Sequence, residues 1–461
     1  MPAGMDESGG PQLQRRLGVF QATALNMANM VGVGPFITIP LIMGHMAGPQ
    51  VIVGWALGLI VALADSMVWC ELGAAMPGSG GTYHYLREVF RPWRWGRILP
   101  FLFIWQFIFS GPLEVASGCI GIVNYLNEVW PTNWVPLLVR EDVKLLSIAG
   151  KLTASFAAGF AVLLLYRRIQ SVGKLTVALW IAMVVTVVIV IGTCAVAFDP
   201  ALAFAFPPGA FSFDGKFGLA LGGALGIAMY DFLGYYDICY LGEEVRDPAR
   251  TIPAAVVVSV FAVAAIYTGI NVGLLGVLPV DKIKASNAVV SDLVGVVWGA
   301  KWALRAVTWL IILTAFASVF ALLLGYSRIP FAAARDGYFF RIFADLHPEG
   351  FPRFSLLVLG VVTMVACWFP FETVLTALLT SRILAQFVCQ IAAVVVARRA
   401  RPDIARPFRM WLYPFPCAVA LVGWLYVFGA SGWKAITYGL STVALGVAVY
   451  FIAANWSRRP Q

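Results

Sequence analysis

Long apolar segments separated by short polar connections extend over almost the whole chain. Each segment is long enough to cross a bilayer, which takes ~20 helical residues. The segments fall at residues 17–43, 50–76, 98–126, 147–166, 172–197, 217–241, 251–278, 302–326, 354–371, 373–397, 411–431 and 433–455. They are continuous and far longer than the ~10-residue alternating strands of a membrane barrel. The pattern therefore predicts an all-α integral membrane protein with twelve transmembrane helices.

Two of these segments are interrupted near the middle by residues that disfavour a helix. The first contains Asn29-Met-Val-Gly-Val-Gly-Pro-Phe36, and the sixth contains Asp231 and Gly234. Inside a helix, glycine costs ~1 kcal/mol and proline ~3 kcal/mol relative to alanine. Broken helix within a membrane is tolerated only where it faces a cavity or packed protein. Interrupted spans at corresponding positions of two halves indicate a transporter binding site, and two unrelated kinks are the alternative.

The two interrupted spans are five helices apart, so a second five-helix unit would start from the opposite side of the membrane. We expect inverted repeats at residues 17–198 and 199–400, followed by two helices and a cytoplasmic end at 401–461. The polar segment 1–16 is expected to be a disordered cytoplasmic tail. Arginines concentrate in the connections on the side of the termini, as in Arg398-Arg399, and short cytoplasmic loops are enriched in Lys and Arg. We therefore predict a multi-pass plasma-membrane protein with both termini in the cytoplasm.

Composition and charge narrow the class of protein. The chain of 461 residues is 61% hydrophobic and 12% charged, whereas soluble domains carry ~25% charged residues. The net charge of +9 follows the loop arginines and indicates no nucleic-acid partner. The seven cysteines form neither a disulfide framework nor a metal-binding pattern. Phosphate loops, nucleophile elbows and helical metal motifs are missing from the sequence, so we expect neither enzyme activity nor a cofactor.

Few ionisable residues lie inside the predicted spans, and each is a functional candidate because a charge at mid-membrane costs ~2.5–3.5 kcal/mol. These residues are Asp65, Glu71, Glu114, Lys174, Asp231, Asp237 and Arg382. Asp231 and Asp237 flank the interruption of the sixth span, where they either satisfy freed backbone donors or hold an ammonium group or a proton. Glu114 either carries a proton or forms a buried salt bridge with Arg382. Glu71 is interpreted as structural.

Four segments, in the right order, resemble signatures of the amino acid–polyamine–organocation superfamily, and the resemblance covers essentially the whole chain. The segments are Glu71-Leu-Gly-Ala-Ala-Met-Pro-Gly-Ser-Gly-Gly-Thr-Tyr83, Gly242-Glu-Glu-Val-Arg-Asp-Pro-Ala-Arg-Thr-Ile-Pro253, Ser327-Arg-Ile-Pro-Phe-Ala-Ala-Ala-Arg-Asp-Gly337 and Arg406-Pro-Phe-Arg-Met-Trp-Leu-Tyr-Pro414. The second has Asp247 where the superfamily usually has asparagine. The resemblance implies five-plus-five inverted repeats and two further helices, with helices one and six unwound in mid-membrane.

The resemblance also implies a substrate site between these two unwound helices. Amides of the first would bind a substrate carboxylate, since the positive end of a half-helix attracts anions. Carbonyls of the second would bind the ammonium group, and Tyr230 or Phe232 would gate the site. The residues expected to bind substrate are Val31, Gly32, Val33, Gly34, Glu114, Tyr230, Asp231, Phe232, Gly234 and Asp237. Lys174, together with Ser318, is expected where sodium-coupled relatives hold their ion; a lysine extending to the membrane interface is the alternative.

These observations favour a secondary active transporter for amino acids that works by alternating access. Its partners would be a small-molecule substrate, a proton or counter-substrate, and the lipid bilayer. A polyamine transporter of the same fold is the alternative, because Tyr236-Asp237 resembles the polyamine-transporting branch and Glu114, Asp231 and Asp237 would suit a polycation. A channel or a receptor is disfavoured, since the sequence has no sizeable segment outside the membrane.

Overall fold

The computed structural model describes residue 15 and residues 17–32, 34–46, 48–129, 137–140, 143–166, 169–212, 214–348 and 350–456. Side chains are described throughout these ranges except at 137–145, 169–176 and 453–456. Val33 and the side chain of Lys174 therefore lie outside the described residues, as does most of the predicted N-terminal tail.

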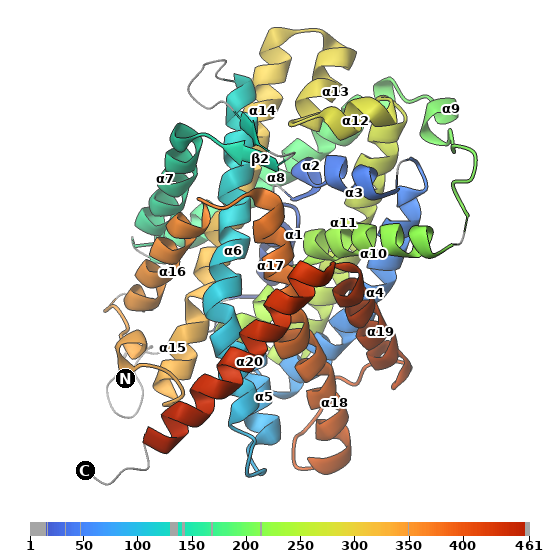
Figure 1. Cartoon of the computed structure of the whole chain (residues 1–461). Coiled ribbons are helices and arrows are strands. Elements are labelled where there is room, and N and C mark those ends of the chain that lie inside the picture. Colours follow the sequence, from blue (N-terminus) through green and yellow to red (C-terminus); the bar gives the residue numbers. More distant parts are fainter. Residues whose placement is uncertain are drawn as a thin grey trace.

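Most described residues belong to helices, and the longest helices run along a common axis (Figure 1). The first half contains α1 (Val19–Met30), α2 (Gly34–Ile37), α3 (Ile39–Met46), α4 (Val51–Ala75), α5 (Thr82–Phe90), α6 (Ile98–Val129), α7 (Ile148–Leu165), α8 (Ile169–Val196), α9 (Pro200–Ala203) and α10 (Gly215–Phe232). The second half contains α11 (Pro248–Leu275), α12 (Val280–Ala285), α13 (Val289–Trp298), α14 (Lys301–Tyr326), α15 (Arg328–Arg335), α16 (Arg353–Ala366), α17 (Phe371–Arg382), α18 (Cys389–Ala400), α19 (Phe415–Ala430) and α20 (Trp433–Trp456).

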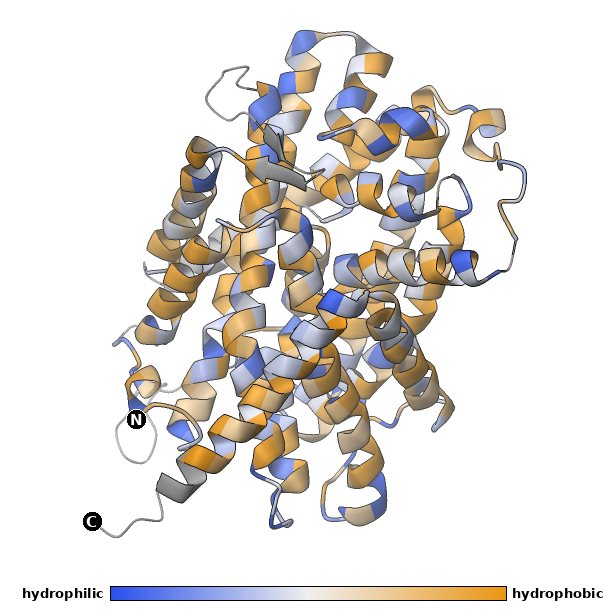
Figure 2. Ribbon diagram, in the orientation of Figure 1, coloured by the Kyte–Doolittle hydropathy of each residue, from blue (hydrophilic) through white to orange (hydrophobic). Residues whose placement is uncertain are grey.

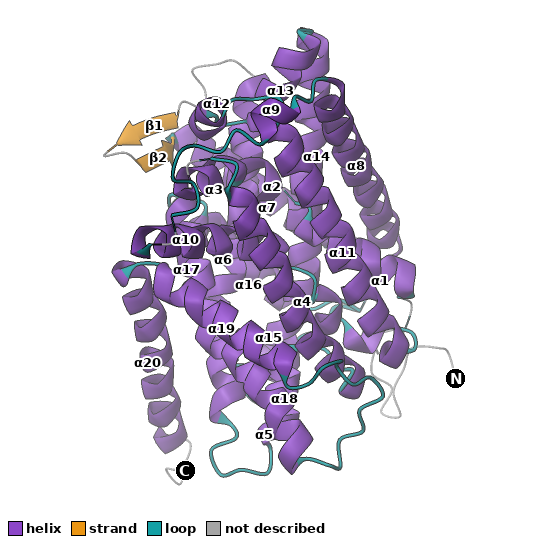
Figure 3. Cartoon of the chain, turned by 90° about the vertical axis from the view of Figure 1, so that its right-hand side faces the viewer, coloured by secondary structure: helices purple, strands orange, loops and turns teal. Residues whose placement is uncertain are grey.

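A two-stranded hairpin, which the apolar pattern did not predict, lies in the connection between α6 and α7. Its strands β1 (Leu137–Arg140) and β2 (Val143–Leu146) pair antiparallel, with Leu137 opposite Leu146. Figure 3 shows the hairpin at the end of the bundle that also carries α12 and α13. It belongs to a connection and leaves the helical architecture unchanged.

Eight helical stretches among the described residues are long and apolar enough to cross a membrane, and a ninth results if α1 to α3 form one bent span. The two arms of that span meet at 58°. The helices α10, α16 and α19 coincide with three further predicted segments but are shorter. Hydrophobic residues cover the sides of the bundle, and hydrophilic residues gather towards its two ends (Figure 2). This distribution is that of a multi-pass membrane protein, because the sides face lipid.

The helices around the molecule's centre bring the two interrupted segments together. The helices α6 and α14 pack against each other, as do α4 and α11, and α1 contacts both α11 and α14. In Figure 1, α3 and α10 run across the bundle rather than along it, and the two are in contact. The break after α1 and the end of α10 consequently lie side by side at the bundle's core.

At one end of the bundle, ion pairs join two of the segments that carry the superfamily signatures to each other and to helix α5. Arg335 of α15 pairs with Glu243 at 2.8 Å, and Arg328 pairs with Glu244 at 3.2 Å. Arg87 of α5 pairs with Asp336. The bonds connect the loop after α10, the helix α15 and the helix α5 into one closed layer on the side that the arginine distribution predicts to be cytoplasmic.

Asp247, the departure from the superfamily pattern, precedes α11 with φ at 42°. A non-glycine residue rarely adopts this left-handed conformation, and Asn and Asp are the residues that tolerate it best. The substitution of aspartate for the usual asparagine therefore keeps the backbone geometry that starts α11.

Candidate functional site

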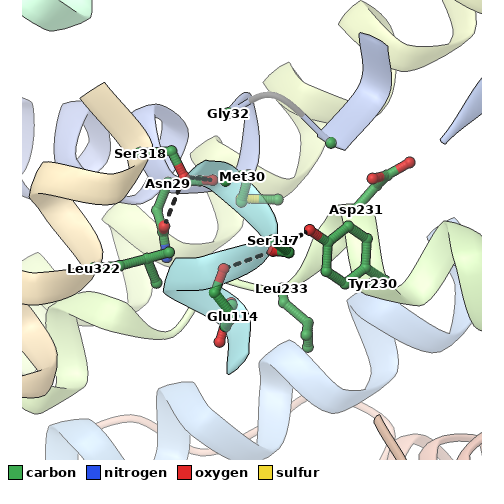
Figure 4. Close-up of a pocket in the computed structure, with 12 residues that line it drawn as sticks. Asn29, Met30, Gly32, Glu114, Ser117, Tyr230, Asp231, Leu233, Ser318 and Leu322 are labelled. Carbon is green, nitrogen blue, oxygen red and sulfur yellow. Dashed lines mark hydrogen bonds between the residues drawn. The ribbon is translucent and has the colours of Figure 1, made fainter. Parts of the chain in front are cut away.

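A small cavity lies where the first interrupted segment meets the end of α10 (Figure 4). Helices α6 and α14 form its remaining walls. Its lining residues are Asn29, Met30, Gly32, Gly34, Glu114, Ser117, Gly118, Tyr230, Asp231, Leu233, Ser318 and Leu322. Of the residues that the sequence singles out, Gly32, Gly34, Glu114, Tyr230, Asp231 and Ser318 lie on this wall. The structure places Val31, Phe232, Gly234 and Asp237 behind it.

Glycine is required at the break after α1 because neighbouring groups approach the backbone closely. A Cβ atom at Gly32 would lie 2.6 Å from both Cβ and Oγ of Ser318 on α14. A Cβ atom at Gly34 would lie 2.5 Å from Oδ1 of Asp231 on α10. These distances are shorter than any van der Waals contact allows, so side chains at either position would displace the cavity wall.

Tyr230 spans the cavity from the end of α10 to α6. Its hydroxyl lies 2.7 Å from the hydroxyl of Ser117, whose Oγ also donates to the backbone carbonyl of Glu114 at 2.6 Å (Figure 4). Phe232, the other aromatic candidate, packs in the core against Trp55 and Tyr267. Of the two predicted gating residues, only Tyr230 contacts the cavity.

The chain leaves helical geometry after Phe232, and Gly234 then turns it with a positive φ. This residue has φ at 111°, and a Cβ atom there would lie 2.6 Å from Nδ2 of Asn29. Asn26, one turn earlier on α1, donates to the Tyr235 carbonyl at 2.6 Å and accepts from the Ile238 amide at 3.0 Å. Asn26 of α1 thus satisfies two backbone groups that the end of α10 leaves unpaired.

Asp237 lies beneath the cavity floor rather than on it. Its Oδ2 accepts a hydrogen bond from Nδ2 of Asn29, and its Oδ1 has no hydrogen-bond partner among the described residues. The side chain is buried. Asp237 therefore contacts the first interrupted segment directly and the cavity only through Asn29.

Asp231 stands on the cavity wall beside Gly34. Its Oδ2 lies 2.6 Å from the hydroxyl of Thr38, and its Oδ1 has no hydrogen-bond partner within the described ranges. The Thr38 hydroxyl also lies 2.8 Å from the Gly34 carbonyl. The acid that ends α10 is thus bound to the connection between α2 and α3.

Glu114 and Arg382 form an ion pair at the other side of the cavity. Arg382 is 0% exposed and its Nε donates to the hydroxyl of Ser110 at 3.1 Å. Tyr326 of α14 donates to the Glu114 carboxylate, and its ring lies beneath the guanidinium. The arginine ends α17, where six residues of π-helix, Ile383–Val388, begin. Such irregular turns are frequent at functional sites.

Two further buried acids lie outside the cavity. Asp65 of α4 accepts hydrogen bonds from Trp69 at 3.0 Å, Tyr235 at 2.5 Å and Trp424 at 3.2 Å. Glu71 pairs with Arg398 of α18 and accepts the Met410 amide at 2.8 Å. Both acids hold α4 to the second half of the chain.

Sequence reasoning missed the uncharged polar residues of the site. Asn26, Thr38, Ser117 and Tyr267 were not singled out, although each makes a buried hydrogen bond at the broken ends. The Tyr267 hydroxyl lies 2.5 Å from the Met30 carbonyl and 2.7 Å from the Asp231 carbonyl. The only available signal was Asn26 and Asn29, which lie one helical turn apart in an apolar span.

Comparisons with known proteins identify the family. The family model for amino acid permeases matches residues 17–457. An uncharacterized transporter of Mycobacterium tuberculosis is 28% identical over 97% of this chain and 93% of its own length. A branched-chain amino acid permease of Bacillus subtilis is 23% identical over 96% and 94%. A large neutral amino acids transporter small subunit 2 of Oryctolagus cuniculus is 27% identical over 100% and 84%. Since the family match spans nearly the whole chain, this protein belongs to the amino acid permease family.

Proposed function

We propose that the protein is a secondary active transporter that carries amino acids across the plasma membrane by alternating access. The observation that supports it most directly is the cavity between the end of α1 and the end of α10, in the middle of an apolar bundle. Transporters of this kind bind substrate at the midplane, where discontinuous helices expose backbone groups. The names of the relatives, which include branched-chain and large neutral amino acids, agree with this substrate class.

The substrate would lie between the two broken helices. Amides at residues 32–34 would bind the carboxylate, and carbonyls at the end of α10 would bind the ammonium group. Leu233 lines the cavity from that end. Tyr230, which is hydrogen-bonded to Ser117 across the space, would have to release this bond for substrate to enter or leave.

The two ends of the bundle differ, which supports a state in which substrate reaches the cavity from only one side of the membrane. The end predicted to be cytoplasmic carries the ion pairs of Arg335 with Glu243 and Arg328 with Glu244. Towards the other end, a hollow lies between α3, α6 and the start of α17. We propose that this hollow is the route to the outside and that the ion pairs close the inward route.

The proposed architecture is the one that the resemblance implies. It comprises twelve spans, with inverted repeats at 17–198 and 199–400 and cytoplasmic termini. The bent span α1 to α3 and the shortened α10 would be its two unwound helices. Lys174, on α8, and Ser318 would occupy the place of a coupling ion. Ser318 supports this, since its hydroxyl lies 3.2 Å from the Asn29 carbonyl.

A polyamine as substrate is less compatible with the charges around the cavity. A polycation requires several uncompensated acids, yet Glu114 is bound by Arg382 and Asp237 lies behind the wall. Asp231 alone remains for a second or third ammonium group. A substrate with one ammonium group suits the cavity better.

Uptake of radiolabelled amino acids by proteoliposomes tests the function. The panel should include leucine, phenylalanine, lysine, glutamate, putrescine and spermidine. Gly34→Leu should abolish uptake because the new side chain fills the space next to Asp231, whereas Gly44→Leu is the matched control, since a Cβ at Gly44 meets no atom within 4 Å. The proposal fails if no amino acid is taken up, or if Gly34→Leu transports as well as Gly44→Leu.

A further inference from the structure

The cavity wall carries two carboxyl groups in different electrostatic situations. Glu114 is compensated by Arg382 and also bonded by Tyr326. Asp231 forms no ion pair within the described part of the chain, and a single hydroxyl, that of Thr38, faces its Oδ2. Asp231 is 2% exposed. An ionised carboxylate buried without a cation is costly, so Asp231 requires a positive charge or a proton.

The hydrogen bonds of the Thr38 hydroxyl favour a protonated Asp231 over an ionised one. The Thr38 hydroxyl lies close to two acceptors, the Gly34 carbonyl at 2.8 Å and Oδ2 of Asp231 at 2.6 Å. A hydroxyl has one hydrogen and can donate to only one of them. If Asp231 is protonated, its O–H donates to Thr38, and Thr38 donates to Gly34. Both short contacts are then hydrogen bonds, whereas an ionised Asp231 leaves one of them without a hydrogen.

The position of Asp231 also limits which substrates can bind while its carboxyl group is ionised. Its Oδ1 lies against Gly34, the end of the segment whose amides would bind the substrate carboxylate. Two like charges held this close repel strongly where little water screens them. A substrate carboxylate and an ionised Asp231 therefore exclude each other, and a proton on Asp231 removes the conflict.

We propose that Asp231 is the proton-binding residue of the transport cycle and that each amino acid crosses with one proton on this carboxyl group. The inference rests on the proposed function, because it requires a substrate with a carboxylate at residues 32–34. The proton binds the Asp231 carboxylate from the outer solution, crosses with the substrate and leaves to the inner solution. A zwitterionic substrate and a neutral Asp231 then leave the filled cavity without net charge.

The groups that face Asp231 come from four elements. Thr38 faces it from the connection between α2 and α3, and the Tyr267 hydroxyl of α11 binds its backbone carbonyl at 2.7 Å. Tyr230 precedes it on α10, and Glu114 of α6, with its arginine, lies across the cavity. Because Arg382 is paired with Glu114, none of these groups supplies a cation that could neutralise Asp231 in place of a proton.

The first test measures protons on the unmodified protein. Leucine binding to detergent-purified protein is followed by calorimetry in buffers with different ionisation enthalpies, which reports the protons taken up per leucine. At a pH where the empty site is ionised, we expect up to one proton per leucine, and affinity should fall about tenfold for each further pH unit. In proteoliposomes, an outside pH two units below the inside pH should drive accumulation up to about hundredfold.

The second test removes the proton site. Asp231→Asn keeps the shape of the side chain and should abolish gradient-driven accumulation and proton entry, so that leucine only equilibrates. Asp65→Asn is the matched control, because Asp65 is also buried without an arginine but lies outside the cavity. It should keep gradient-driven accumulation. Asp231→Glu should keep proton coupling and shift its pH range.

The outcomes separate the two proposals. If leucine or another amino acid of the panel binds and crosses without protons, the proposed role of Asp231 is wrong. Amino acid transport as the function is not affected by that result. Proton-driven accumulation by Asp231→Asn overturns the proposed role as well. Uptake of putrescine in place of every amino acid overturns both, since Asp231 would then bind an ammonium group.

Discussion

The ion pair between Glu114 and Arg382 gives a quantitative test of the electrostatics beside the cavity. Arg382 is 0% and Glu114 6% exposed, so both charges have lost nearly all contact with water. Removing one partner of such a pair typically costs ~3–5 kcal/mol, because the other charge stays buried and unpaired. Arg382→Met replaces the aliphatic part of the arginine side chain but leaves Glu114 with the Tyr326 hydroxyl and no cation. We expect a loss of ~3–5 kcal/mol in the free energy of unfolding.

The double substitution Glu114→Gln with Arg382→Met separates charge from packing. It removes both charges at once, and replacing a buried pair by uncharged groups is often close to neutral. We therefore expect the double variant to be more stable than Arg382→Met alone, with a coupling energy of several kcal/mol in the double-mutant cycle. Unfolding in detergent measures Arg382→Met, Glu114→Gln and the double variant. Arg353→Met is the control, since its pair with Asp345 has side chains 49% and 40% exposed and should contribute little to stability. Additive losses would refute the reasoning.

Three further predictions concern the gate, the broken helices and the inward closure. Tyr230→Phe removes the hydrogen bond to α6 and should speed substrate release in stopped-flow binding while leaving equilibrium unfolding within ~1 kcal/mol; unchanged release would argue against a gate. Tyr267→Phe leaves two helix-end carbonyls with one donor fewer and should cost ~1–3 kcal/mol of stability, measured by thermal unfolding against Tyr438→Phe. Burial raises the pKa of Glu243, but the bonds from Arg335 outweigh it and hold that pKa below its usual range. The stability that the ionised Glu243 contributes is therefore fully present above the ordinary glutamate pKa of ~4.3 and is lost as pH falls through the lowered value. Glu243→Gln should accordingly reduce the dependence of the free energy of unfolding on pH in the acid range.

The helices were predictable because the membrane imposes their length and polarity. The segments at 50–76 and 302–326 correspond to α4 and α14 within a few residues, since apolar runs of this length have one stable form in lipid. The sixth segment was different. It is apolar to residue 241, yet α10 ends at Phe232. That end depends on Gly234 and on asparagines contributed by α1, which hydropathy does not report.

The candidate acids were predictable, and the buried pair of Glu114 with Arg382 was one of the two alternatives for Glu114, but the partners of the other acids were not predicted. An ionisable residue in an apolar span is conspicuous in any sequence, and Glu114, Asp231 and Arg382 were found in this way. Which acid is neutralised depends on the packing of α6 against α17, and that contact joins residues far apart in the chain. Thr38 and Ser117 were missed because hydroxyl side chains are common in membrane helices and carry no periodic signal.

The buried acids differ in their partners, and this difference indicates which parts of the protein respond to what occupies the cavity. Glu71 and Glu114 are bound by arginines of α18 and α17, which ties the first half of the chain to the second with pairs that are expensive to break. Asp231 and Asp237 each have one described hydrogen-bond partner, from the first interrupted segment, and one oxygen without a partner among the described residues. A carboxyl group in that situation is stable only while a proton or a cationic group is present. Its free energy therefore changes with what occupies the cavity, and it changes at the two helix ends that have to move. The arginine pairs, whose charges are compensated, have no such dependence. If the proposed function holds, we therefore expect ligand binding to act on the ends of α1 and α10 rather than on the helices that these pairs join.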